Sequence, residues 1–62
     1  MSVNNYLEIH REGNEYVISD LWADTQQGKV IKKVRGLKSA IEWAEMYQKE
    51  FPAEYGIHFG DI

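Results

Sequence analysis

The stretch Leu37–Phe51 decides the fold; it reads L-K-S-A-I-E-W-A-E-M-Y-Q-K-E-F. Good helix formers combine there with apolar residues spaced i, i+3, i+4 and i+7, which is the pattern of an amphipathic helix. Pro52 ends this helix because proline cannot continue the hydrogen-bond ladder and disfavours helical backbone at the residue before it. The stripe that we expect to face the core consists of Leu37, Ala40, Ile41, Ala44, Gln48 and Phe51.

Three strands are predicted before the helix, because apolar and polar residues alternate there. Residues 6–11 (Y-L-E-I-H-R) and 16–23 (Y-V-I-S-D-L-W-A) flank Gly13-Asn14, which is a two-residue hairpin signal of type I′ or II′. A polar connection ending in glycine then leads to a third strand at residues 29–35 (K-V-I-K-K-V-R). The order of these segments predicts an antiparallel sheet.

The hairpin register contains one mismatch, because Leu7 falls opposite Asp20. We expect a β-bulge near Ser19-Asp20 to correct it by turning Leu21 toward the core. The third strand is expected to place Val30 and Val34 on one face and Ile31, Lys33 and Arg35 on the other.

The C-terminal residues 54–60 (E-Y-G-I-H-F-G) alternate again and predict a short fourth strand. A right-handed crossover through the helix places this strand beside the first one and parallel to it. The predicted fold is therefore α+β, with element order β-β-β-α-β. A three- to four-stranded, mostly antiparallel sheet of spatial order 3-2-1-4 is packed by one amphipathic helix in a single domain, residues 1–62.

The composition and the N-terminal sequence indicate where the protein is found. Cysteine is absent, which removes disulfides and thiolate metal sites and is typical of a reducing cytoplasm. Residues 1–8 have neither the basic nor the apolar region of a signal peptide, and no apolar run approaches the roughly 20 residues that cross a bilayer. We expect a soluble cytoplasmic protein without a membrane partner.

No pattern predicts an enzyme, a metal site or a cofactor. His10 and His58 are the only histidines, and two histidines without further ligands make a weak metal site. Ser19 and Ser39 lack the G-x-S-x-G context of a nucleophile, and a domain of 62 residues has little room for a deep pocket. We therefore expect no catalytic residues, no metal and no cofactor.

A basic segment offers one possible binding surface. Five basic residues and no acidic one lie in residues 29–38, between two acidic segments. A basic strand in a small sheet is one way to read nucleic acid, whereas the net charge of −3 favours the simpler interpretation that these lysines keep an edge strand soluble. The nucleic-acid candidates are Lys29, Lys32, Lys33, Arg35 and Lys38.

The helix offers the other possible surface. Trp43 lies at the margin of the apolar stripe, and Met46 lies nearly opposite it. With Tyr47 they form a flank, with Glu50 beside it, that one thin sheet cannot fully cover. Exposed Trp, Tyr and Met often mark a protein contact. The alternative is that Trp43 folds over the sheet edge or the C-terminal residues, so that only Met46 is exposed. We expect a protein partner of unknown identity, with a homodimer as one form of this contact, and we rank nucleic acid below it.

The arrangement of G-N-E-Y-V-I-S-D, Q-G-K-V-I, G-L-K-S-A-I-E-W-A-E and E-Y-G-I-H-F resembles small uncharacterised proteins of bacteria and their phages. The resemblance covers most of the chain. It implies a stand-alone accessory protein from a phage or mobile element that binds and modulates a host macromolecule. It implies no functional residues.

Overall fold

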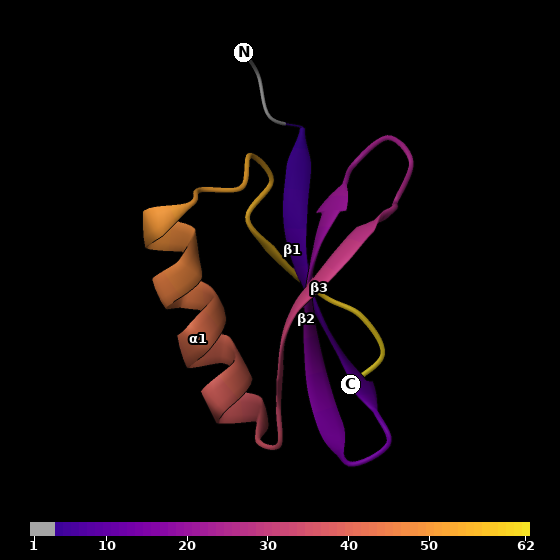
Figure 1. The fold of residues 1–62 in the computed structure, drawn as a ribbon, viewed down its shortest axis with the longest axis vertical. Helices are drawn as coiled ribbons and strands as arrows, with labels where there is room; N and C mark the ends of the chain where they lie inside the picture. The colour runs from indigo at the N-terminus through magenta and orange to yellow at the C-terminus, as the bar shows by residue number, and fades with distance from the viewer. Residues whose placement is uncertain (1–3) are drawn as a thin grey trace.

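A computed structural model describes residues 4–62 as a sheet with one helix on one of its faces (Figure 1). The prediction about an N-terminal leader falls partly on residues 1–3, which lie outside the described residues. The elements are β1 (Asn5–Glu12), β2 (Glu15–Trp22), β3 (Gly28–Val34), α1 (Leu37–Glu50) and β4 (Ile57–Phe59).

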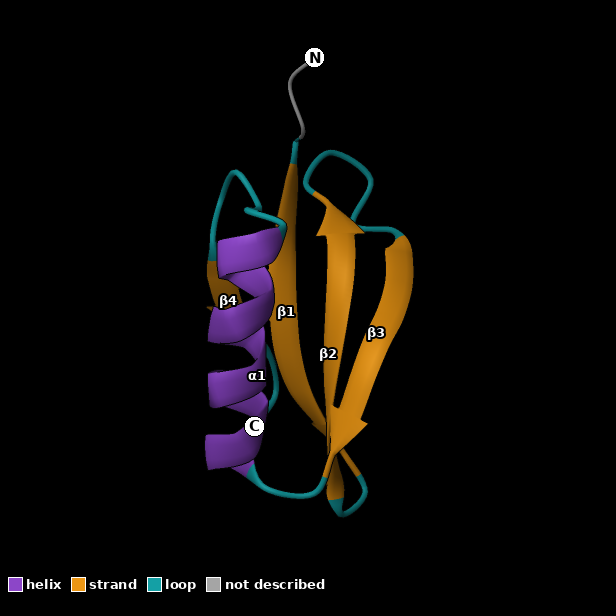
Figure 2. Ribbon diagram, turned by 60° about the vertical axis from the view of Figure 1, so that its left-hand side comes forward, coloured by secondary structure: helices purple, strands orange, loops and turns teal. Residues whose placement is uncertain are grey.

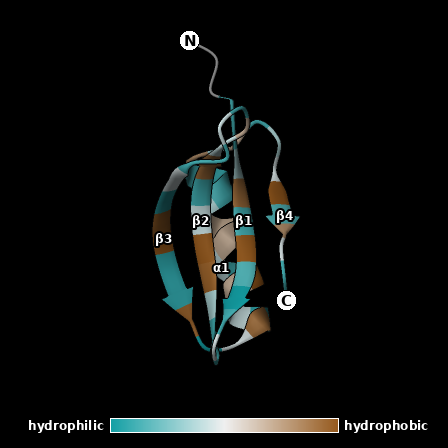
Figure 3. Cartoon of the chain, turned by 90° about the vertical axis from the view of Figure 1, so that its right-hand side faces the viewer, coloured by the Kyte–Doolittle hydropathy of each residue, from teal (hydrophilic) through white to brown (hydrophobic). Residues whose placement is uncertain are grey.

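Within the described residues the sheet has four strands in the order β3-β2-β1-β4, which confirms the predicted α+β fold. β1 pairs antiparallel with β2, β2 pairs antiparallel with β3, and β4 runs parallel to β1. Helix α1 covers one face (Figure 2), and no element of residues 4–62 covers the opposite face, which is turned toward the viewer in Figure 3. We call this uncovered side the open face. No helix in residues 4–62 is long and apolar enough to cross a membrane.

The turn between β1 and β2 is of type II′. Gly13 has φ +66°, whereas Asn14 is not among the residues of positive φ, and this combination defines the type II′ turn. The β1–β2 register then runs without interruption from Glu12–Glu15 to Asn5–Trp22, with Leu7 opposite Asp20. The predicted bulge near Ser19-Asp20 is therefore wrong for this hairpin.

The irregularity lies instead in β3. Ile18 pairs with Lys32 and Ser19 pairs with Val30, which leaves Ile31 as the extra residue of a bulge. The extra residue shifts the alternation, so the predicted faces of β3 are wrong. Ile31 and Val34 both pack against the core, whereas Val30 is 51% exposed.

The core lies between α1 and the central strands. Its centre consists of Leu7, Ile9, Ile18, Ala40 and Ala44, all fully buried, with Ala53 at 5% exposure. The small alanines allow α1 to approach the sheet closely.

The prediction that the apolar stripe of the helix ends at a core residue Phe51 is wrong, because Phe51 is 61% exposed. Helix α1 ends at Glu50, and the Gln48 side chain turns the chain back after Pro52. The Gln48 amide donates to the Ala53 carbonyl, and its Oε1 accepts from the Ala53 N–H, both at 3.1 Å. Ala53 therefore occupies the end of the core, and Phe51 is directed outward.

Candidate functional site

An aromatic row runs along one side of α1. Trp43, Tyr47 and Phe51 are spaced four residues apart, so their side chains lie one above the other on the helix. The Trp43 and Tyr47 rings are stacked, with centroids 5.2 Å apart and planes at 18°. The Tyr47 and Phe51 rings are tilted at 39°, with centroids 5.1 Å apart. We call this row, together with Met46 and Glu50, the helix flank.

Part of the helix flank packs against the core, and the rest is exposed. Trp43 and Tyr47 are half-buried and pack against the core, whereas Met46 is 67% and Phe51 61% exposed. All five residues line one shallow hollow of about 190 Å³. Trp43 therefore contributes to the core and to the surface at once, so the two alternatives expected from the sequence are both partly realised.

Phe51 is the flank residue that the sequence pattern assigned wrongly to the core. Its spacing of four residues from Tyr47 was a usable signal, since i,i+4 aromatic pairs meet on a helix surface. The predicted members Trp43, Met46, Tyr47 and Glu50 do lie together.

The basic residues do not form one face. Lys32 pairs with Ile18 and Lys33 with Val17, and these two partners point to opposite sides of the sheet. All five predicted basic residues are exposed, and within residues 4–62 no lysine or arginine forms an ion pair. Neighbouring residues of a strand alternate in face, and the bulge at Ile31 also places Lys29, which pairs with Asp20, on the face opposite to Lys33. The remaining basic candidates, Arg35 and Lys38, follow at the connection to α1 and in its first turn.

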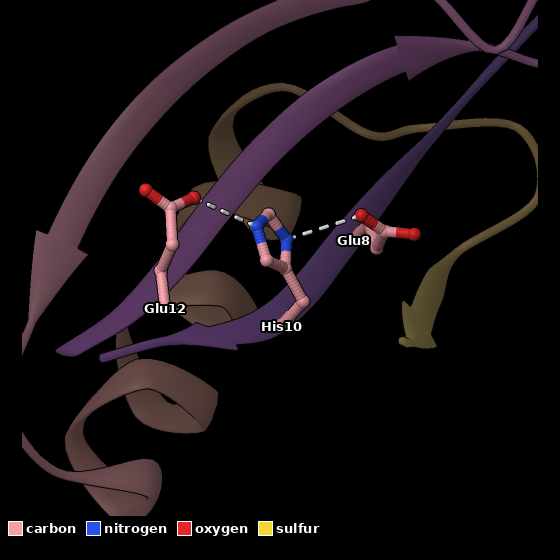
Figure 4. Close-up of polar contacts among 3 residues, drawn as sticks. All are labelled: Glu8, His10 and Glu12. Atoms are coloured by element: carbon pink, nitrogen blue, oxygen red, sulfur yellow. Dashed lines mark hydrogen bonds and ion pairs between the residues drawn. The ribbon is translucent and has the colours of Figure 1, made fainter. Parts of the chain in front are cut away.

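Acidic side chains occupy the open face of β1 (Figure 4). The His10 ring lies between two carboxylates, with Nδ1 3.2 Å from Glu8 Oε1 and Nε2 3.2 Å from Glu12 Oε2. Within residues 4–62, Nδ1 is buried and makes no hydrogen bond. His10 pairs with Val17, which is fully buried on this face, so the cluster also shields Val17 from water.

The two histidines lie on the same face but have separate partners. The His58 ring packs against Tyr6 with centroids 4.9 Å apart, and its Nε2 lies 2.9 Å from the Tyr55 carbonyl oxygen. Across the part of the chain that the structure describes, no group of three or more His, Cys, Asp and Glu side chains is placed to hold a metal.

Comparison with known proteins gives no match from which a function could be inferred. No protein-family model, no curated protein and no solved structure matches the chain.

Proposed function

We propose that this chain is a small non-enzymatic accessory protein that binds a protein partner through the helix flank. The observation that carries the proposal is the stacked row Trp43–Tyr47–Phe51 with Met46 exposed beside it. Trp and Tyr are the residues most often found to dominate the affinity of protein interfaces. A phage or mobile-element protein that modulates a host protein in the cytoplasm would act through such a surface.

The anchoring of the row supports this role. Because Trp43 and Tyr47 already pack against the core, little side-chain entropy remains to be lost when a partner binds. Met46 and Phe51 supply the exposed apolar area, and the unbranched Met46 side chain adapts to an irregular partner. Glu50 provides a charged rim, as is usual around the apolar centre of an interface.

The second candidate function is nucleic-acid binding through the basic segment. It is supported by the exposure of Lys29, Lys32 and Lys33 without ion-pair partners among residues 4–62. The carboxylates of Glu8 and Glu12 on the open face count against it, because they would repel phosphates approaching the sheet.

Two charge-introducing variants test the primary proposal. Met46→Glu and Val30→Glu each place one carboxylate at an exposed apolar residue, the first in the helix flank and the second on the open face of β3. We expect tagged wild type and Val30→Glu to capture the same protein from the source cell, and Met46→Glu to lose it. Thermal melts of both variants establish that they are folded. Loss of capture by Val30→Glu alone would contradict the proposal.

A salt titration separates the two candidate functions. Binding to duplex DNA or RNA that weakens steeply with salt would favour the basic segment, because phosphate contacts release counterions. No binding at low salt would exclude that alternative. Sedimentation at several protein concentrations tests the homodimer: the wild type is expected to exceed 7.2 kDa at high concentration, and Met46→Glu to remain at it.

A further inference from the structure

A second hollow lies at the end of the sheet where β1, β4 and the β2–β3 connection meet. Its volume is about 600 Å³, and its lining includes three aromatic rings other than those of the helix flank. We call it the tyrosine hollow; the lining residues that matter here are Tyr6, Glu8, Gln26, Tyr55, His58 and Phe59.

Backbone hydrogen bonds hold the walls of the tyrosine hollow together. The Ala23 N–H donates to the Asn4 carbonyl at 2.8 Å, which fixes the β2–β3 connection against β1. The Tyr55 N–H donates to the Asn5 carbonyl at 3.0 Å, which fixes the segment before β4. His58 Nε2–H donates to the Tyr55 carbonyl at 2.9 Å, since a carbonyl only accepts, so the His58 ring is held against Tyr6. The backbone of the hollow and the His58–Tyr6 ring contact are therefore in place before any ligand arrives.

The charge in the tyrosine hollow is negative. Glu8 is the one charged residue of its lining, and the Glu8 side chain is 30% exposed. Oε1 of Glu8 lies beside His10, whereas Oε2 makes no hydrogen bond or ion pair within residues 4–62. Aromatic faces attract cations through the ring quadrupole, and a free carboxylate oxygen adds to this attraction. The chain's net charge of −3 acts in the same direction.

We propose that the tyrosine hollow binds an arginine side chain of a peptide or protein. A guanidinium is planar, stacks on aromatic rings and pairs with a carboxylate, which matches Tyr6, Tyr55 and Phe59 around Glu8. The hollow is broad and open, which suits an arginine side chain with its flanking peptide better than a small ammonium ion. This site is separate from the helix flank and does not depend on it.

The test is a titration of the ¹⁵N-labelled full chain with the peptide acetyl-Gly-Arg-Gly-Arg-Gly-amide. We expect the amide signals of Tyr6, Glu8 and His58 to shift, with a Kd of about 1 mM. The same peptide with citrulline in place of arginine keeps the shape without the charge, and it should bind at least about tenfold more weakly. Peptides with lysine in place of arginine, and tetramethylammonium, should also bind more weakly.

Glu8→Gln tests the role of the carboxylate in the hollow, and Glu12→Gln is its matched control. Glu8→Gln is expected to weaken the arginine peptide about tenfold, whereas Glu12→Gln, which removes the other carboxylate at His10 but lies outside the hollow, should change the affinity less than about twofold. Tyr55→Ala, at a residue that is 53% exposed, is a second disruption of the hollow that leaves the core intact. The proposal is overturned if the shifts map elsewhere, if lysine, citrulline or tetramethylammonium binds as well as arginine, or if Glu8→Gln and Tyr55→Ala bind like wild type.

Discussion

The contact between Asn5 and Asp20 provides the sharpest test of how the sheet is held together. Asn5 is only 7% exposed, and its Nδ2 donates to Asp20 Oδ1 at 2.7 Å. The same Asn5 side chain accepts from the Glu54 N–H at 3.4 Å. This arrangement gives a polar partner to Asp20, which lies opposite the buried Leu7 on the helix-covered side of the sheet.

The loss of stability expected when one partner is removed follows from the charge and burial of this pair. A hydrogen bond to a charged group stabilises a protein by about 1.5–3 kcal/mol, and removal of one partner leaves the other without compensation. We therefore expect Asn5→Ala to lower the free energy of unfolding by about 2–3 kcal/mol. A chain of 62 residues has a total free energy of unfolding of about 3–9 kcal/mol, so this loss is a large fraction of its stability.

The assay is a double-mutant cycle measured by urea denaturation. Asn5→Ala, Asp20→Ala and the double variant should yield a coupling free energy of about 1.5–2.5 kcal/mol. Asn14→Ala, at an exposed turn residue, is the control and should change stability by less than about 0.5 kcal/mol. A coupling below about 0.5 kcal/mol would refute the reasoning, because the two side chains would then contribute independently.

Four further variants test local features by the same denaturation assay. Gly28→Ala should cost about 3 kcal/mol because its Cβ would overlap the Asp20 carbonyl. Gly36→Ala, whose Cβ meets nothing closer than 3.7 Å, should cost no more than about 1 kcal/mol, through the poorer N-cap; equal costs would contradict the β2–β3 packing. Gly36→Asp should add about 0.5–1 kcal/mol, since the helix lacks a side-chain N-cap and has no acidic residue in its first turn; a loss would contradict this. Gln48→Ala should cost about 1–2 kcal/mol through its two hydrogen bonds to Ala53, and an unchanged midpoint would show that they do not hold the turn.

Local patterns were sufficient to predict the architecture. The alternation in residues 6–11 and 16–23, the Gly13-Asn14 turn and the helix ending before Pro52 are short-range signals, and the crossover rule then placed β4 beside β1. The bulge in β3 was not predictable in this way. Its position depends on how Ile31 meets the core across the sheet, which no alternation pattern within β3 encodes.

The candidate sites, too, could be predicted only where their residues are related by local spacing. Trp43, Met46, Tyr47 and Glu50 were identified from helical spacing, because residues on one helix share a side at known intervals. Phe51 was assigned to the core, since nothing in the spacing shows that Gln48 bonds to Ala53 and directs the chain end outward.

The tyrosine hollow was missed altogether. Tyr6 and Tyr55 are distant in the sequence, and they become neighbours only through the parallel pairing of β4 with β1. A site assembled across such a pairing has no local signal in either segment.

The most direct test of the central claim uses the two tryptophans as internal reporters. Trp43 lies in the helix flank, whereas Trp22 lies at the end of β2 and is 51% exposed. The two indole N–H signals of the ¹⁵N-labelled chain are followed while the captured partner protein is added. The Trp43 signal is predicted to shift or broaden while the Trp22 signal stays in place; a shift of Trp22 with Trp43 unchanged would contradict binding through the helix flank.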